Sequence, residues 1–197
     1  SKDNAVLFLK LLKKYPNFSF EKIDINDLKY LNNHDYFINF AASTHVQNSI
    51  IDSKEFIHDN ILGLQNILEL IRKKPDYGVD RPILLHCSTD EVVSDLSLLK
   101  VDEKAPLNPA SPYAASKAAG ELLIQSWRRT YEIDYVIVRP SNNYGIYQHE
   151  EKLIPLAVNN LRRNKKISLH DNGSPMRTWV HVEDTCEAIF KIIDSGV

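Results

Sequence analysis

A tyrosine and a lysine four residues apart are a pair whose side chains could do chemistry together. Tyr113 and Lys117 stand in the run Tyr-Ala-Ala-Ser-Lys, and a spacing of four places both on one face of a helix. A lysine cation beside a tyrosine hydroxyl favours the phenolate, because the opposite charge lowers the pKa of the phenol. The pair therefore indicates a base that accepts a proton from a substrate alcohol.

Four polar residues precede this pair and follow an apolar segment. They are Ser88, Thr89, Asp90 and Glu91. Two hydroxyls and two adjacent carboxylates at the carboxyl end of a strand are in the place where α/β proteins carry their sites. Each group alone also has a plain structural explanation, since the acidic run could be a turn and the tyrosine-lysine pair a solvated surface pair. Their occurrence together, in this order, favours chemistry.

The apolar pattern predicts the elements that would position these residues. Short apolar or alternating segments predict strands, and longer segments with a period near 3.6 predict helices. The expected strands are residues 18–25, 36–41, 82–88, 134–140, 166–170 and 176–182. The expected helices are a segment ending before Tyr15 and residues 27–31, 53–73, 111–131, 151–163 and 182–193. Apolar strands that alternate with helices predict an α/β fold, a doubly wound, Rossmann-like parallel sheet covered on both faces.

Composition limits the class of protein without naming a function. The 197 residues are 43% apolar and 25% charged, with a formal net charge of −2. This describes a globular chain without a basic field for nucleic acid. Cys87 and Cys186 lie far apart in apolar segments, so we interpret them as buried small residues of a cytoplasmic protein. No apolar run approaches the ~20 residues that cross a membrane, and we expect no metal site.

Three motifs occur in a defined order along the chain. They are Ser-Thr-Asp-Glu at 88–91, Tyr-Ala-Ala-Ser-Lys at 113–117 and Ser-Asn-Asn-Tyr-Gly at 141–145, with further segments at 40–46, 151–155 and 177–184. Together they resemble, in order and spacing, the dTDP-glucose 4,6-dehydratases and their UDP-glucose-using relatives, of the extended short-chain dehydrogenase/reductase class. The Asp-Glu pair after Thr89 is the discriminating element, because related epimerases and decarboxylases usually have other residues there.

The resemblance implies a role for each residue of the first two motifs. Tyr113 would take the proton of the sugar 4-hydroxyl while hydride leaves C4 for NAD, and Lys117 would hold the phenolate and the nicotinamide ribose. Glu91 would then remove the C5 proton as base, while Asp90 protonates the departing C6 hydroxyl as acid. Hydride would return to C6. Thr89 would orient the sugar near its 4-hydroxyl.

The same resemblance implies two sets of binding residues. Those expected at the NAD cofactor are Asp24, Ile25, Ala41, Ala42, Asn60, Ser88, Tyr113, Lys117 and Asn142. Those expected at the nucleoside diphosphate sugar are His45, Thr89, Asn143, Lys152, Leu153 and Arg177. The guanidinium of Arg177 suits phosphate oxygens. Taken singly, however, Arg177 could be a surface arginine and His45 a helix-start or core histidine.

We expect two parts in the chain. Residues 1–150 would be a partial NAD-binding, Rossmann-like domain with the catalytic residues, and residues 151–197 part of a smaller substrate-binding lobe with a returning helix. The helices at 53–73 and 111–131 would pair in a homodimer, as they do in the family.

Two departures from the family pattern leave other interpretations open. The scattered glycines form no Gly-rich turn for the cofactor pyrophosphate, so we expect a chain that is incomplete at both ends. Val93-Ser94 stands where the family usually has Tyr-Gly, which removes packing and backbone freedom from the turn. The alternatives are a sugar-nucleotide epimerase or decarboxylase of the same superfamily, and a catalytically silent homologue that serves as a structural or dimerisation module.

Overall fold

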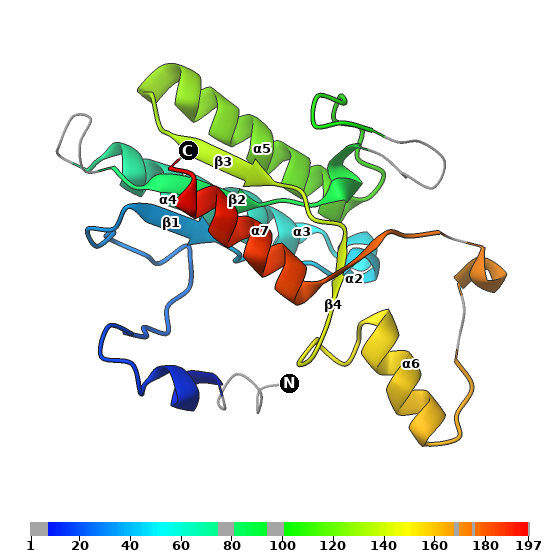
Figure 1. The fold of residues 1–197 in the computed structure, drawn as a ribbon. Coiled ribbons are helices and arrows are strands. Elements are labelled where there is room, and N and C mark those ends of the chain that lie inside the picture. The colour runs from blue at the N-terminus through cyan, green and yellow to red at the C-terminus, as the bar shows by residue number, and fades with distance from the viewer. Residues whose placement is uncertain (1–7, 75–80, 94–100, 168–169, 175, 197) are drawn as a thin grey trace. The chain divides into compact units, whose positions relative to one another are not determined.

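The computed structural model describes residues 8–74, 81–93, 101–167, 170–174 and 176–196 (Figure 1). The chain divides into two compact units. The larger unit contains the described residues of 23–141 and 189–197, and the smaller contains those of 1–22 and 142–188. The expected division at residue 150 stays a prediction.

Three parallel strands form the sheet of the larger unit. They are β1 (Tyr36–Asn39), β2 (Ile83–Cys87) and β3 (Tyr135–Val138), in the order β1-β2-β3. Ile38 pairs with Leu85, and Leu85 pairs with Val136. The strands predicted at 36–41, 82–88 and 134–140 are thereby confirmed. Parallel strands end at the same edge of the sheet, so the polar residues after β1, β2 and β3 are brought together there.

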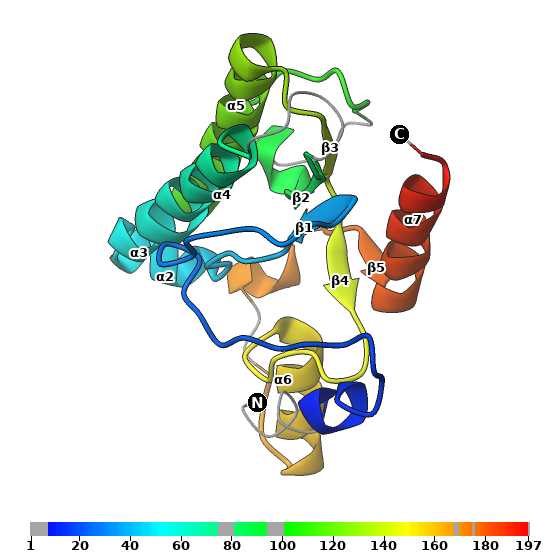
Figure 2. The same ribbon diagram turned by 90° about the vertical axis from the view of Figure 1, so that its left-hand side faces the viewer.

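Helices connect these strands on one face of the sheet (Figure 2). α3 (Lys54–Ile57), the π-helical segment η1 (His58–Leu62) and α4 (Gly63–Arg72) follow one another without a break, and α5 (Pro112–Tyr131) links β2 to β3. Both connections advance in the same direction across the sheet, so right-handed crossovers place both helices on the same face. The helices predicted at 53–73 and 111–131 are confirmed.

The core of the larger unit lies between this helical layer and the sheet. Its fully buried side chains are Leu64, Ile67, Leu68, Ile71, Leu84, Ile124 and Ile133. The four from α4 recur at the spacing of one helical face. This apolar stripe is therefore what holds the helix against the strands.

The last turns of α7 (Val182–Asp194) belong to the same unit and cover the opposite face of the sheet (Figures 1 and 2). The Tyr36 hydroxyl donates a 3.1 Å hydrogen bond to the Ile193 carbonyl, and Ile189 is buried. Helices on both faces of a parallel sheet are the α/β architecture that the sequence predicts.

The smaller unit has its own short parallel pair, β4 (Asn142–Tyr144) with β5 (Trp179–His181). It also holds α6 (Leu153–Arg162), the first turns of α7 and a helical segment at residues 8–12. Gly145 is required where β4 meets α7, because a Cβ there would lie 2.6 Å from Val182 Cγ1. The strand predicted at 176–182 and the helices predicted at 151–163 and 182–193 are confirmed.

Three expected elements differ in the structure. Residues 18–25 form no strand, and residues 27–31 form no helix; a turn spans residues 25–27. The Asn66 side chain on α4 donates to the carbonyls of Ile25 (2.8 Å) and Leu28 (3.0 Å), so these two carbonyls are satisfied without regular structure. The strand expected at 166–170 is also wrong at its end, where η3 (His170–Gly173) is a 3-10 turn; residues 168–169 lie outside the described residues. α2 (Val46–Ile51) was not predicted.

A cavity substitution tests the core. Leu68→Ala removes a side chain with no exposed surface, and we expect the free energy of unfolding to fall by about 2–5 kcal/mol. Urea denaturation of the full-length protein measures it. Leu68→Met, which conserves volume, should cost less than about 1.5 kcal/mol, and equal costs for the two variants would contradict the assigned core.

Candidate active site

The turn after β2 carries the first polar motif and is tied by its backbone to the end of β3. The Ser88 amide donates to the Val138 carbonyl (2.8 Å), and the Asp90 amide donates to the Pro140 carbonyl (3.3 Å). The chain then makes a 3-10 turn, η2 (Asp90–Val93). Val93 is buried, while Ser94 lies outside the described residues. Two neighbouring strand ends thus fix the position of both carboxylates.

Side-chain hydrogen bonds order this turn further. The Thr89 hydroxyl accepts from the Glu91 amide (3.3 Å) and donates to Asp90 Oδ1 (3.3 Å). Burial raises the pKa of Asp90 above its ordinary value, although hydrogen bonds with Ser141 and Thr89 oppose the shift. A raised pKa favours the protonated form, which is the form needed by an acid.

Tyr113 lies in the first turn of α5, and its phenol belongs to the same cluster. Ser111 caps this helix by accepting from the Ala114 amide (3.1 Å), and the Tyr113 amide donates to Ser49 Oγ of α2 (3.1 Å). The phenol is buried and hydrogen-bonds with Thr89. The structure therefore brings together a phenol, a hydroxyl and two carboxylates from β2 and α5.

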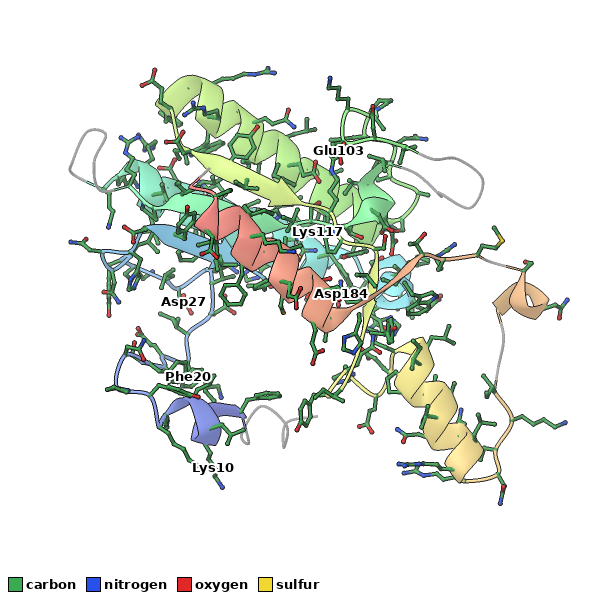
Figure 3. The ribbon with its side chains drawn as sticks, in the orientation of Figure 1. Lys10, Phe20, Asp27, Glu103, Lys117 and Asp184 are labelled. Carbon is green, nitrogen blue, oxygen red and sulfur yellow. The ribbon has the colours of Figure 1, made fainter. Side chains whose placement is uncertain are left out.

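Lys117 follows one helical turn later on α5 (Figure 3). It is also buried. Its ammonium donates to the Cys87 carbonyl at 2.7 Å and lies 3.3 Å from His86 Nε2. Burial lowers the pKa of Lys117 to about 8. Such a lysine can change its charge near physiological pH, unlike a solvated one.

One expectation about this pair is wrong. The pKa of Tyr113 is raised to about 12, chiefly by burial and then by the negative charge of Glu91. The hydrogen bond with Thr89 acts in the opposite direction but is weaker. The Lys117 ammonium is directed to the Cys87 carbonyl. Burial and the negative charge of Glu91 therefore set the direction of the Tyr113 shift.

Two buried polar residues beside Lys117 were not predicted. His86 lies within β2 and Asn39 ends β1; the Asn39 amide nitrogen is 3.1 Å from His86 Nδ1. Each is at most 3% exposed. Burial, followed by the charge of Lys117, lowers the pKa of His86 to about 3, so the imidazole is neutral. A polar residue inside an apolar strand next to a candidate motif was the available signal.

A buried ion pair fixes α5 to the strand ends. Glu121 has no exposed surface and receives a bidentate guanidinium from Arg139, with its shortest contact at 2.6 Å. The Ser88 hydroxyl donates to the same carboxylate at 2.5 Å. Ser88, expected at the cofactor, is therefore also a link between β2 and α5.

Asn60 lies in η1 and joins the end of β1 to α5. Its amide nitrogen donates to Ser116 Oγ (2.8 Å) and the Ser43 carbonyl (3.0 Å), and its oxygen accepts from the Ser43 amide (2.8 Å). Ala41 and Ala42 occupy the segment between β1 and Ser43. All three expected cofactor residues thus lie beside the end of β1.

Other expected binding residues of this unit have local structural contacts. The Asp24 carboxylate accepts from the amide and side chain of Asn26, which lowers its pKa. Ile25 packs against Gly63: a Cβ added at Gly63 would lie 2.5 Å from Cγ2 of Ile25. His45 caps α2 by accepting from the Asn48 amide at 3.4 Å.

The remaining expected residues belong to the smaller unit. Asn142 donates to the Thr178 carbonyl (3.3 Å), and the Thr185 hydroxyl donates to Asn143 Oδ1 (2.6 Å). Lys152 precedes α6 as its N-cap, and Leu153, the first residue of that helix, is 50% exposed. Arg177 is exposed and donates to the Met176 carbonyl (2.8 Å).

A family comparison matches almost the whole chain. Residues 4–197 match the model of the NAD dependent epimerase/dehydratase family. The chain is 38% identical over 205 residues to a dTDP-glucose 4,6-dehydratase of Haemophilus influenzae, covering 95% of this chain and 59% of that protein. It is 41% identical over 165 residues to the dTDP-glucose 4,6-dehydratase of Mycolicibacterium smegmatis, covering 82% of this chain and 48% of that one.

A solved structure is similar as well. The dTDP-glucose 4,6-dehydratase DesIV of Streptomyces venezuelae, with NAD and TYD bound, superposes with a TM-score of 0.85 at 39% identity. The match covers 92% of this chain and 56% of that one. The chain thus spans about half the length of the relatives it matches. These findings confirm the resemblance and the Rossmann-like fold drawn from the sequence.

The Glu121–Arg139 pair gives a prediction about stability. Glu121→Gln leaves a guanidinium partly buried without its carboxylate, so we expect a loss of roughly 3–5 kcal/mol in the free energy of unfolding. The double variant Glu121→Leu with Arg139→Met should lose less, because no unpaired charge remains. Urea unfolding of both variants decides the matter; a double variant less stable than the single one would contradict the interpretation.

Proposed function

The chain belongs to the NAD dependent epimerase/dehydratase family, and from this premise we propose that the full-length protein is a nucleoside diphosphate glucose 4,6-dehydratase acting on dTDP-glucose. The observation that carries the proposal is the pair Asp90 and Glu91, held on the turn after β2 beside the Tyr113 phenol. An epimerase needs an alcohol oxidised and reduced, whereas elimination of water needs an additional acid and base. The relatives named dTDP-glucose 4,6-dehydratase support the same choice.

Oxidation of the sugar is assigned to Tyr113, with Thr89 and Lys117 as its partners. Tyr113 accepts the proton of the 4-hydroxyl, and the Thr89 hydroxyl, which already hydrogen-bonds with the phenol, orients that hydroxyl. Because burial raises the pKa of Tyr113 to about 12, the phenol holds its proton at neutral pH when no ligand is bound. Positive charge brought close to the phenol by Lys117 and a bound cofactor would lower it.

Elimination is assigned to the two carboxyl groups. The 4-ketone acidifies the C5 proton, which Glu91 removes as base, and Asp90 gives its proton to the departing C6 hydroxyl. These roles require one carboxyl to be ionised while its neighbour is protonated. The raised pKa of Asp90 supports that division, because burial favours its neutral form.

The residues at the strand ends fit the nicotinamide side of NAD. Lys117 has three N–H groups when charged, with the Cys87 carbonyl as one acceptor, so it can also donate to a ribose hydroxyl. Ser88 and Asn60 offer further polar groups, and Ala41 and Ala42 leave room near β1. Asp24 and Ile25 would meet the adenine side, and Asn142 completes the set. A bound NAD would supply the acceptor for the C4 hydride and the hydride that returns to C6.

The smaller unit supplies the proposed nucleotide-binding residues. Arg177 is exposed, and its planar guanidinium matches diphosphate oxygens. Lys152 adds a cation, Leu153 an exposed apolar contact and Asn143 an amide. His45 of the larger unit would contact the sugar.

We propose further that the protein is a cytoplasmic homodimer. Large apolar side chains are exposed on the helical layer, including Ile57, Leu62 and Leu122, and pairing of two such layers would cover them in a four-helix contact. Cys87 and Cys186 are both free, which suits a reducing compartment. Cys87 is half-buried and Cys186 is exposed, so the interpretation of both as buried residues is wrong for Cys186. Among the described helices, none is long and apolar enough to cross a membrane.

Removal of the proposed base tests the elimination step. With dTDP-glucose and NAD, Glu91→Gln should form the 4-keto-6-deoxy product about 100-fold more slowly, or slower still. NADH absorbance should still appear, because C4 oxidation does not need Glu91. Tyr113→Phe should lose both signals. Glu103→Gln, an exposed control, should keep both, and full product formation by Glu91→Gln would reject the assigned base.

The proposed acid gives a pH dependence. Elimination needs Asp90 protonated, so kcat should fall as pH rises through its pKa, which burial places above the ordinary aspartate value. We expect Asp90→Asn to lose this fall of kcat with rising pH, the alkaline limb of the profile, and to slow elimination by about 100-fold or more. The pH profile of kcat measures both effects. Asp102→Asn, at an exposed residue, should leave the profile unchanged, and persistence of the limb in Asp90→Asn would exclude Asp90 as its source.

A further inference from the structure

A chain of hydrogen bonds crosses the sheet from β1 through β2 to α5. The Ala41 amide donates to Asn39 Oδ1 (3.0 Å), and Asn39 Nδ2 lies 3.1 Å from His86 Nδ1. His86 Nε2 lies 3.3 Å from Lys117 Nζ, which donates to the Cys87 carbonyl. The three side chains are 2–3% exposed. Their hydrogen bonds are therefore made with one another and not with bulk water.

The first donor in this chain fixes the direction of all the others. A backbone N–H can only donate, so the atom of the Asn39 amide that faces the Ala41 N–H must be the oxygen. The NH₂ group of Asn39 then faces His86. His86 Nδ1 must then accept. Because a neutral imidazole carries one hydrogen, that hydrogen lies on Nε2 and points at Lys117.

This direction distinguishes the two charge states of the lysine. An ammonium has three N–H groups and no lone pair, so the N–H of His86 would face another donor. A neutral amine has a lone pair that accepts from His86, and it still donates to Cys87. The N–H of His86 has an acceptor only when Lys117 is neutral, and a donor left unsatisfied in a buried site is costly.

We propose that Asn39 and His86 are positioning residues that act through this directed relay to weaken the hold of Lys117 on its proton. The inference rests on the proposed function for its catalytic consequence: the relay sets the upper pH at which Lys117 can still support the Tyr113 phenolate. The hydrogen-bond direction itself rests only on the described contacts.

Other groups around Lys117 act on the same equilibrium. Charges on the Cys87 thiol and on Glu121 favour the ammonium, but Glu121 is already paired with Arg139. Tyr113, one turn earlier on α5, holds its proton at neutral pH. The carboxylates of the turn after β2 act mainly on that phenol. Burial and the His86 relay thus oppose the ammonium.

Reversal of the relay provides the test. In Asn39→Asp, a carboxylate accepts from both the Ala41 amide and His86 Nδ1, so the histidine hydrogen moves to Nδ1 and Nε2 accepts from an ammonium. The midpoint of Lys117 titration, followed through the ¹³C shift of its ε-carbon in the full-length protein, should rise from about 8 by about one unit or more.

The histidine tautomer is read separately from ¹⁵N-histidine spectra. The signal of His86 is the one that disappears in His86→Gln, a variant whose amide can keep the relay direction and should leave the lysine midpoint near its original value. Wild-type protein should show hydrogen on Nε2, and Asn39→Asp hydrogen on Nδ1. Asn108→Asp, an exposed site on the same unit, controls for added charge and should change neither signal.

The outcomes separate this inference from the proposed function. Wild-type His86 with its hydrogen on Nδ1, or a lysine midpoint unchanged by Asn39→Asp, would overturn the relay whatever the activity. If the relay is present and dTDP-glucose is not converted, the proposed function fails alone. If both hold, the alkaline limb of kcat/KM should move upward in Asn39→Asp together with the lysine midpoint.

Discussion

The buried attachment of α5 to the strand ends is the constraint on which the rest of the site depends. Lys117 and Glu121 lie one turn apart on this helix, and each is an ionisable group almost without exposed surface. Such groups must find partners, and they find them at the carboxyl ends of the strands: the Cys87 carbonyl for one, Arg139 and Ser88 for the other. The same contacts that satisfy them also set the position of Tyr113, on the preceding turn.

Much of the larger unit could be predicted because its apolar periodicity is strong. The stripe on α4 and the apolar strands follow from single-sequence pattern alone. The segment at 18–25 shows the limit of this reasoning. It alternates like a strand, yet it forms none, and the Ile25 carbonyl at its end accepts a hydrogen bond from the side chain of Asn66, which lies far away in sequence. Alternation does not reveal whether a neighbouring strand is present to pair with.

The candidate site was predictable in its residues but not in its protonation. The spacing of Tyr113 and Lys117 does place them on one helix, and the acidic motif does follow β2. The sign of the Tyr113 shift was missed because desolvation depends on three-dimensional burial, which spacing does not record. Asn39 and His86 were missed for a similar reason. Neither residue alone indicates a site, and their hydrogen bond forms only because the two strands pair side by side in the sheet.

The π-helical segment η1 divides one continuous helix into two parts that face different neighbours. Before it ends, Asn60 points its amide to Ser116 and Ser43; after it, α4 presents its apolar stripe to the core. A π turn holds one residue more than an α turn, and one residue corresponds to about 100° of rotation. Deletion of a single residue within 58–62 would leave a regular α-helix. Such a helix could not direct Asn60 to Ser116 and Ser43 and, at the same time, direct the apolar stripe of α4 to the core. The extra residue therefore lets one helix contribute both to the candidate site and to the core.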